Sequence, residues 1–194
     1  MAWEPLGPKA PCPCNQARPI PKVWRTMLSY RKANLNDVEA LAKTRSGFLL
    51  EVGEFKDASE VHAIEAANSA YFQDALANES FIAWLALDDD KIVATSGLTF
   101  SSIPPTPRWP NGKAAHIMNI YTLPAYRKRG IAKELLTRII EEANTRGCSK
   151  IELNATEAGK PLYQSCGFQD VQGDMVLYRD ARYRQTADTA SHER

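Results

Sequence analysis

The sequence predicts a mixed α/β domain in which helices cover the faces of a sheet. Short segments in which apolar residues alternate, bounded by turn residues, predict strands, and two long segments with apolar residues at helical spacing predict helices. A strand, a long helix and a second strand follow one another within 114–155, which is typical of a parallel crossover. The expected order of elements is βααβββαβαββ, with this central β–α–β unit forming a parallel pair of strands.

The first predicted elements are a short strand over 27–32 and two helices. Asn36 is expected to cap the first helix, with Glu39 reaching back from the third helical position. The second helix is expected over 58–77. The first carries apolar residues on one face, namely Val38, Leu41 and Ala42, and the apolar positions of the second include Val61, Ile64, Ala67 and Phe72.

A hairpin follows, with strands over 81–87 and 92–100 joined by a turn over 88–91. The next segment, 101–113, holds four prolines and reads as a loop, and loops of this length within a compact domain are often functional.

The second half of the chain begins with a strand over 114–122 and a strongly amphipathic helix over 131–146, which Gly147 ends. The apolar positions of this helix fall at helical spacing: Ile131, Leu135, Leu136, Ile139, Ile140 and Ala143. A strand over 150–155, a helix over 156–166 and two short strands up to 178 complete the prediction.

The predicted domain covers 27–180, between a leader and a polar tail. Residues 1–26 hold six of the twelve prolines and show no apolar periodicity, so we expect either a disordered extension or a natural start at Met27. Residues 181–194 are polar and are expected to fray.

Composition excludes several classes of protein. Hydrophobic residues make up 44% of the 194 residues, enough for a core, and a formal net charge of +1 gives no basic field for nucleic acid or a membrane surface. No apolar run approaches the roughly 20 residues of a membrane span, and no apolar secretion signal opens the chain. Cys12 and Cys14 lack a second ligand pair at metal-binding spacing. We therefore expect a cytoplasmic protein with free thiols, no metal, no membrane association and no nucleic-acid partner.

The segment with the clearest chemistry joins the strand 114–122 to the helix 131–146. Three basic residues precede Gly130 at the start of the helix, where unpaired N–H groups and the helix dipole favour an anion. Residues 126–138 contain five basic side chains and one acidic one. A solvated basic turn is the simpler interpretation of the triplet alone, but its position between a strand and a helix favours phosphate binding. Neither a Walker loop nor a three-glycine dinucleotide fingerprint is present.

These residues resemble the acetyl-CoA signature of the GCN5-related N-acetyltransferases (GNAT), Arg/Gln-x-x-Gly-x-Gly/Ala, as Arg127-x-x-Gly130-x-Ala132. A second block, Asn154 followed by the segment 161–168 with Tyr163, is similar to the family's Leu-Tyr-x-x-x-Gly-Phe block. The resemblance covers about residues 28–179.

The resemblance implies a role for each matching residue. Backbone groups of Tyr121 and Thr122 would pair with the pantetheine arm of acetyl-CoA, and Asn154 would hydrogen-bond the pantetheine or acetyl region. Tyr163 would protonate the departing thiolate as general acid. The pyrophosphate would lie against Arg127, Lys128, Arg129, Gly130, Ile131 and Ala132. Two simpler interpretations stay open, namely that Tyr163 only packs its helix against the sheet and that Asn154 only caps a strand.

The general base is not marked by any motif. Many relatives carry a glutamate on the strand before the signature, whereas 114–122 has none. Strand alternation predicts that Ile117, Asn119 and Tyr121 share one face of this strand, with His116 and Met118 on the other. We expect a base acting through ordered water, and the other conceivable bases are His116, Glu51, Glu54 and Glu79.

The resulting hypothesis is an enzyme that transfers an acetyl group from acetyl-CoA, its co-substrate, to a primary amine of a small molecule or peptide by direct attack. The acceptor pocket is expected between the first two helices and the loop 101–113, with Trp109 and Arg108. The alternatives are a non-catalytic CoA-binding regulatory module on the same fold and a nucleotide-phosphate site. A homodimer is conceivable because dimers are common among such proteins.

Overall fold

Five strands form one mixed sheet in the computed structural model, which describes residues 28–55 and 57–171. Their order in the sheet is their order in the chain, and the first three pairings are antiparallel while the last is parallel. The parallel β–α–β unit expected in the middle of the chain is therefore confirmed. The strands are β1 (Ser29–Lys32), β2 (Phe81–Asp88), β3 (Lys91–Ser102), β4 (Lys113–Thr122) and β5 (Lys150–Leu153).

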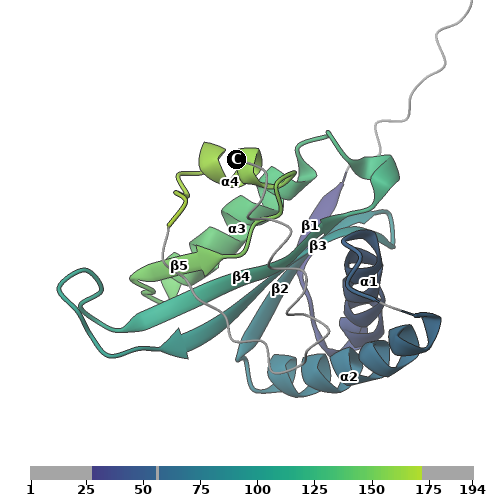
Figure 1. The fold of residues 1–194 in the computed structure, drawn as a ribbon, viewed down its shortest axis with the longest axis horizontal. Helices are drawn as coiled ribbons and strands as arrows, with labels where there is room; N and C mark the ends of the chain where they lie inside the picture. Colours follow the sequence, from purple (N-terminus) through teal and green to yellow (C-terminus); the bar gives the residue numbers. More distant parts are fainter. Residues whose placement is uncertain (1–27, 56, 172–194) are drawn as a thin grey trace, which may run out of the picture.

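Helices cover both faces of this sheet, as Figure 1 shows. α1 (Val38–Glu51) and α2 (Ala58–Ala77) pack on one face, and α3 (Ile131–Thr145) packs on the other. A short helix, α4 (Lys160–Ser165), follows β5, and two single 3-10 turns, η1 (Leu35–Asp37) and η2 (Pro124–Tyr126), precede α1 and α3. Of the helices in the described ranges, none is both long and apolar enough to cross a bilayer.

The core lies on both sides of β2, whose sequence is almost continuously apolar because neither face meets solvent. Phe81 and Leu85 pack against α1 and α2, whereas Ala86 packs against α3 from the opposite face. Leu135 and Leu136 of α3 are fully buried under β2, β3 and β4. Burial of each such leucine contributes roughly 1.5–3 kcal/mol, so these contacts fix the position of α3 and of its N-terminus.

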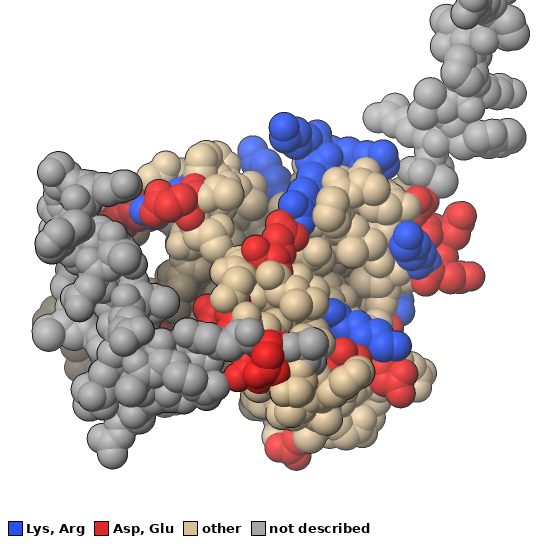
Figure 2. Space-filling model, turned by 45° about the vertical axis from the view of Figure 1, so that its right-hand side comes forward, with Lys and Arg blue, Asp and Glu red and all other residues tan. Residues whose placement is uncertain are grey.

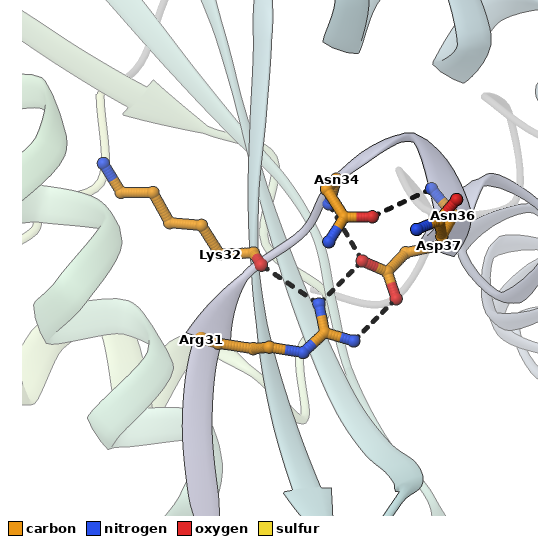
Figure 3. A network of polar contacts seen from close by, with 5 residues as sticks. All are labelled: Arg31, Lys32, Asn34, Asn36 and Asp37. Atoms are coloured by element: carbon orange, nitrogen blue, oxygen red, sulfur yellow. Dashed lines mark hydrogen bonds and ion pairs between the residues drawn. The ribbon is translucent and has the colours of Figure 1, made fainter.

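The chain enters α1 through the hydrogen-bonded turn drawn in Figure 3. The Asn34 side chain accepts from the N–H of Asn36 at 2.9 Å, and Asp37 accepts from the N–H of Asn34 at 2.8 Å. Arg31 of β1 donates two hydrogen bonds to Asp37, at 2.7 and 2.8 Å. The predicted cap at Asn36 with Glu39 is therefore wrong. The capping box is built two residues earlier because Arg31 holds the carboxylate of Asp37 in place.

The other boundaries agree with the sequence pattern except near the C-terminal end. The helix over 58–77 and the hairpin are confirmed, with the turn at Asp89 and Asp90. β5 ends at Leu153 and α4 begins only at Lys160, because Thr156 and Gly159 form a hydrogen-bonded turn between them. Residues 168–171 form no strand, and the rest of the two expected short strands, the leader and the tail fall outside the described residues.

Candidate functional site

The candidate site begins where β4 and β5 part. The two strands pair from Ala114 opposite Lys150 to Ile117 opposite Leu153. β4 then continues to Thr122 while β5 stops, so the β5-facing edge of residues 118–122 has no neighbouring strand in the described part of the chain. Unpaired strand edges bind extended ligands by donating and accepting main-chain hydrogen bonds.

A β-bulge lies in this open part of β4. Gly97 pairs with Met118 and Thr95 with Tyr121, so two β4 residues oppose a single β3 residue. Asn119 takes a left-handed φ of 55°, and its carbonyl accepts from the Thr95 hydroxyl at 3.1 Å. The bulge thus adds one residue to the strand without breaking its pairing to β3.

The bulge turns the following side chains to the other face, so the predicted grouping of Ile117 with Tyr121 is wrong. Ile117 and Ile120 pack on the α3 face, and Met118 packs on the face of α1 and α2. Tyr121 lies with α1, where its ring meets Phe48 edge-on with centroids 6.2 Å apart. Simple alternation fails here because it counts no extra residue.

The connection from β4 to α3 leaves an open helix N-terminus. Gly130 is the N-cap residue with φ 82°, and a Cβ placed on it would meet nothing within 4 Å. The first backbone N–H with a partner in this turn is that of Glu134, which donates to the Gly130 carbonyl at 3.1 Å. The N–H groups of residues 131–133 have no acceptor among the described residues. Together with the helix dipole, they form a site suited to an anion.

The three basic side chains before Gly130 point to different neighbours. Arg129 stacks on the Tyr126 ring, 5.1 Å from its centroid, and the Tyr126 hydroxyl donates to Asp88 at 2.7 Å. Lys128, with a left-handed φ of 60°, is exposed and has no ion-pair partner within the described ranges. In Figure 2, Lys and Arg side chains gather along the upper edge of the molecule, the edge at which Figure 1 places the β4–α3 connection.

Arg127 is directed instead toward α1. Its guanidinium pairs with Glu51 at 2.5 Å, its Nε donates to the Thr122 carbonyl at 2.9 Å, and it lies over the Tyr121 ring. The hydrogen bond from Arg127 lowers the pKa of Glu51. Burial raises the pKa of the Tyr121 hydroxyl, and the negative charge of Glu51 raises that pKa further. The Arg127 side chain therefore ties the loop to α1.

Asn154 and Tyr163 line a separate cavity of about 780 Å³ along β5 and α4. Tyr163 is half-buried, and its ring meets Phe168 edge-on at 6.2 Å between centroids. Burial raises the pKa of its hydroxyl, which has no hydrogen-bond partner among the described residues. Trp109 and Arg108 line the same cavity, whereas α1 and α2 contribute nothing to its lining. The loop 101–113 thus adjoins Tyr163 rather than the first two helices.

The structure therefore places the expected site residues in two groups. Tyr121 and Thr122 are continuous with the loop and helix start at 127–132, and Asn154 shares its cavity with Tyr163. Among the described side chains, no group of three His, Cys, Asp or Glu residues could hold a metal ion.

Of the conceivable bases, the structure argues against Glu79. This residue pairs with Arg146 at the C-terminal end of α3, and a 15-residue helix is about 22 Å long. Glu79 therefore lies at the opposite end of α3 from Gly130. His116 is half-buried in β4 and sits opposite Glu152 in the register with β5.

Sequence reasoning missed Phe48 and Asp88 as neighbours of the site. Phe48 meets Tyr121 across more than 70 residues of chain, and Asp88 binds the Tyr126 hydroxyl across 38. No local pattern marks either contact, because each arises only when the helices and the hairpin pack around the sheet.

Comparison with known proteins covers the part of the chain that forms this site. Residues 49–168 match the model of the acetyltransferase (GNAT) family. A predicted acetyltransferase from Clostridium acetobutylicum, whose crystal structure contains acetyl-CoA, is similar with a TM-score of 0.72 and 35% identity, over 78% of this chain and 96% of that chain. A GCN5-related N-acetyltransferase from Ralstonia eutropha JMP134 is similar with a TM-score of 0.71 and 28% identity, over 78% and 99% of the two chains.

The curated relatives match over shorter stretches. Glucosamine 6-phosphate N-acetyltransferase 1 of Oryza sativa subsp. japonica is 33% identical over 67 residues, which are 34% of this chain and 41% of the relative. Thialysine N-epsilon-acetyltransferase of Mus musculus is 32% identical over 63 residues, which are 31% of this chain and 37% of the relative. The match therefore spans only about two fifths of these relatives. With the family model covering more than half of its residues and the fold agreeing, this chain belongs to the acetyltransferase (GNAT) family.

Proposed function

We propose that this chain is an N-acetyltransferase that moves an acetyl group from acetyl-CoA to a primary amine, with residues 27–180 as the catalytic domain. The observation that carries the proposal is the open N-terminus of α3 behind Gly130, next to the unpaired edge of β4. A 35% identical chain of the same fold has been solved with acetyl-CoA, which supports acetyl-CoA as the ligand of this site.

The residues at the α3 N-terminus fit the pyrophosphate of acetyl-CoA. The free N–H groups of residues 131–133 would donate to its oxygens, and the absent side chain of Gly130 leaves room for it. Lys128 and Arg129 add positive charge close to these amides. The Arg127 side chain, held by Glu51, would keep the loop in position rather than touch the phosphates.

The open edge of β4 fits the pantetheine arm. Backbone groups of Tyr121 and Thr122 would pair with its amides as a neighbouring strand would. When bound, acetyl-CoA supplies a thioester whose carbonyl carbon forms a bond to the acceptor nitrogen as the carbon–sulfur bond breaks. The side chain of Asn154 would hydrogen-bond the arm or the acetyl group from the end of β5.

Tyr163 is the proposed proton donor to the sulfur. Burial raises the pKa of its hydroxyl, so the group is protonated at neutral pH, and no described residue competes for its hydrogen bond. The amine must lose a proton, and Glu51 is a poor base because Arg127 lowers its pKa. We therefore keep a water-mediated base and assign no residue to that role.

The acceptor is proposed to be a free amine on a small molecule or peptide. Two matched relatives are named for glucosamine 6-phosphate and thialysine, both amines. The net charge of +1 gives no basic field for a nucleic-acid or membrane partner, and the enzyme is proposed to act in the cytoplasm without a metal. The homodimer stays a prediction.

The proposal is tested by amine-dependent release of free CoA thiol from acetyl-CoA. Tyr163→Phe should lower kcat by roughly 10²–10⁴-fold, as loss of a general acid does, while the Kd for acetyl-CoA stays within about threefold of the wild-type value. Tyr71→Phe, on the exposed side of α2, is the matched control and should match the wild type. Tight acetyl-CoA binding without turnover of any amine would refute the enzyme in favour of a CoA-binding module. An unchanged kcat in Tyr163→Phe would refute the acid role alone.

A further inference from the structure

Arg45 occupies an unusual position for a charged residue. In α1 it follows the buried residues Leu41 and Ala42 by four and three positions, which places it on the same, core-facing side of the helix. The side chain is half-buried. This face is apolar in the first half of α1, so a guanidinium here interrupts the pattern.

No carboxylate forms an ion pair with Arg45 within the described part of the chain. The ion pairs found there involve other residues, and the guanidinium lies over the Phe48 ring, 5.5 Å from its centroid. Burial lowers the pKa of Arg45, and Glu54 offsets this only in part. Holding a cation partly out of water without a counterion costs free energy, which a bound anion would offset.

A second polar group beside Arg45 also lacks a partner. Ser46 is only 3% exposed, and its hydroxyl oxygen makes no hydrogen bond in the described structure. Buried hydroxyls are usually paired. Two consecutive α1 residues thus carry hydrogen-bonding capacity that the described residues leave unused.

The place of Arg45 in the fold connects it to the proposed reaction. Phe48, on which Arg45 stacks, meets the Tyr121 ring directly after the β4 bulge. Tyr121 belongs to the β4 edge proposed to bind pantetheine. Arg45 therefore lies one aromatic ring away from the cofactor strand, on the α1 side.

Arg45 differs from Arg127, the other arginine that stacks on a ring beside β4, in having no ion-pair partner among the described residues. Arg127 stacks on Tyr121 much as Arg45 stacks on Phe48, but Arg127 is paired with Glu51 and Arg45 is not. An arginine fork matches the two oxygens of a carboxylate or phosphate. We infer that Arg45 binds an anionic group, a carboxylate or a phosphate, on the amine that accepts the acetyl group. This inference rests on the proposed N-acetyltransferase function and adds the class of acceptor.

Two pairs of amines test the inference, since each pair differs only by the anionic group. Lysine is compared with 1,5-diaminopentane for a carboxylate, and phosphoethanolamine with ethanolamine for a phosphate. The kcat/KM of each is measured by thiol release, and the Kd of each is measured by calorimetry on the protein saturated with CoA. At least one anionic amine should exceed its partner by about tenfold or more, the effect of a charge-assisted hydrogen bond pair, and the pair that shows it identifies the anion.

Substitutions of Arg45 test whether this residue causes the preference for the anionic amine. Arg45→Gln should bring the ratio close to one with little change for the uncharged partner, and Arg45→Lys should retain an intermediate ratio because it keeps the charge without the fork. Lys43→Gln, an exposed change on the same helix, should leave the ratio at its wild-type value. Thermal unfolding of each variant checks that it is folded.

Equal values within both pairs, by rate and by binding, would overturn the inference, as would a preference that Arg45→Gln and Arg45→Lys both leave intact. The binding arm is independent of turnover. If anionic amines bind through Arg45 but no amine is acetylated, the anion site stands and the proposed enzyme fails.

Discussion

Gly130 offers the sharpest test of the anion site because the chain supplies its own control. Gly130 and Gly147 lie at the two ends of α3 with φ of 82° and 73°, and a Cβ on either would meet nothing within 4 Å. A non-glycine residue at such a φ costs about 1 kcal/mol. Substituting either residue should therefore lower stability equally, by a shift in Tm of about 2–4 °C for a chain of this size.

Binding of acetyl-CoA should separate the two positions. A carboxylate at residue 130 would lie near the amides of 131–133 that are proposed to hold the pyrophosphate. Two unit charges 5 Å apart interact by about 0.8 kcal/mol at the dielectric constant of water and about 3 kcal/mol at an effective constant of 20. With two phosphate charges, Gly130→Glu should weaken binding by at least about 2 kcal/mol, or roughly 30-fold in Kd.

The assay is isothermal titration of acetyl-CoA into the wild type, Gly130→Glu and Gly147→Glu, with Tm measured for each. Gly147→Glu should bind like the wild type despite its lower Tm. Equal affinities for all three proteins would refute the assignment of the pyrophosphate to the α3 N-terminus. Equal loss in both variants would show that the effect comes from destabilisation alone.

Three further predictions concern stability. Asp37→Ala should lower the free energy of unfolding by about 2–3 kcal/mol in urea titrations, since it removes both the capping box and the charged hydrogen bonds from Arg31; a loss below 0.5 kcal/mol would contradict this. The hydrogen bond from Arg31 is the main cause that lowers the pKa of Asp37. The Asp37 carboxylate therefore stabilises the fold at neutral pH, and this stabilisation is lost as the pH falls below about 4. When unfolding is measured against pH, Asp37→Asn should lose less stability in acid than the wild type does. Gly97→Ala should destabilise by about 1–3 kcal/mol or more, because its Cβ would come within 2.6 Å of the Phe81 ring; an unchanged Tm would show that the ring moves aside freely.

The sequence predicts the fold well because its signals are local. α2 begins and ends at the expected residues, since a run of 20 helix-compatible residues follows the capping residue Asp57. The signal for the proposed anion site is also local, because Gly130 and the first turn of α3 are adjacent in sequence. The parallel pairing of β4 with β5 follows from the length of the crossover helix between them.

What the sequence did not predict depends on contacts between distant segments. The cap of α1 moved to Asn34 because Arg31 of the edge strand holds Asp37. Arg127 belongs to the signature of the loop, yet its side chain is drawn away by Glu51, 76 residues earlier. No residue pattern in β4 marks the bulge at Asn119. The bulge reverses the face of every later side chain in this strand.

The agreement between strand order and chain order has a consequence for how the protein acquires its shape. Every strand pairs with its predecessor in the chain, and the first three pairings are antiparallel. Short-range pairing lowers the entropy cost of closing loops and speeds folding. The short-range pairings are those of β2 with β3 and of β3 with β4, whereas the pairing of β1 with β2 encloses α1 and α2 and that of β4 with β5 encloses α3. During synthesis, β1 to β4 can therefore assemble while Asn154 and Tyr163 are still to be added, and the cavity that these two residues line is completed last.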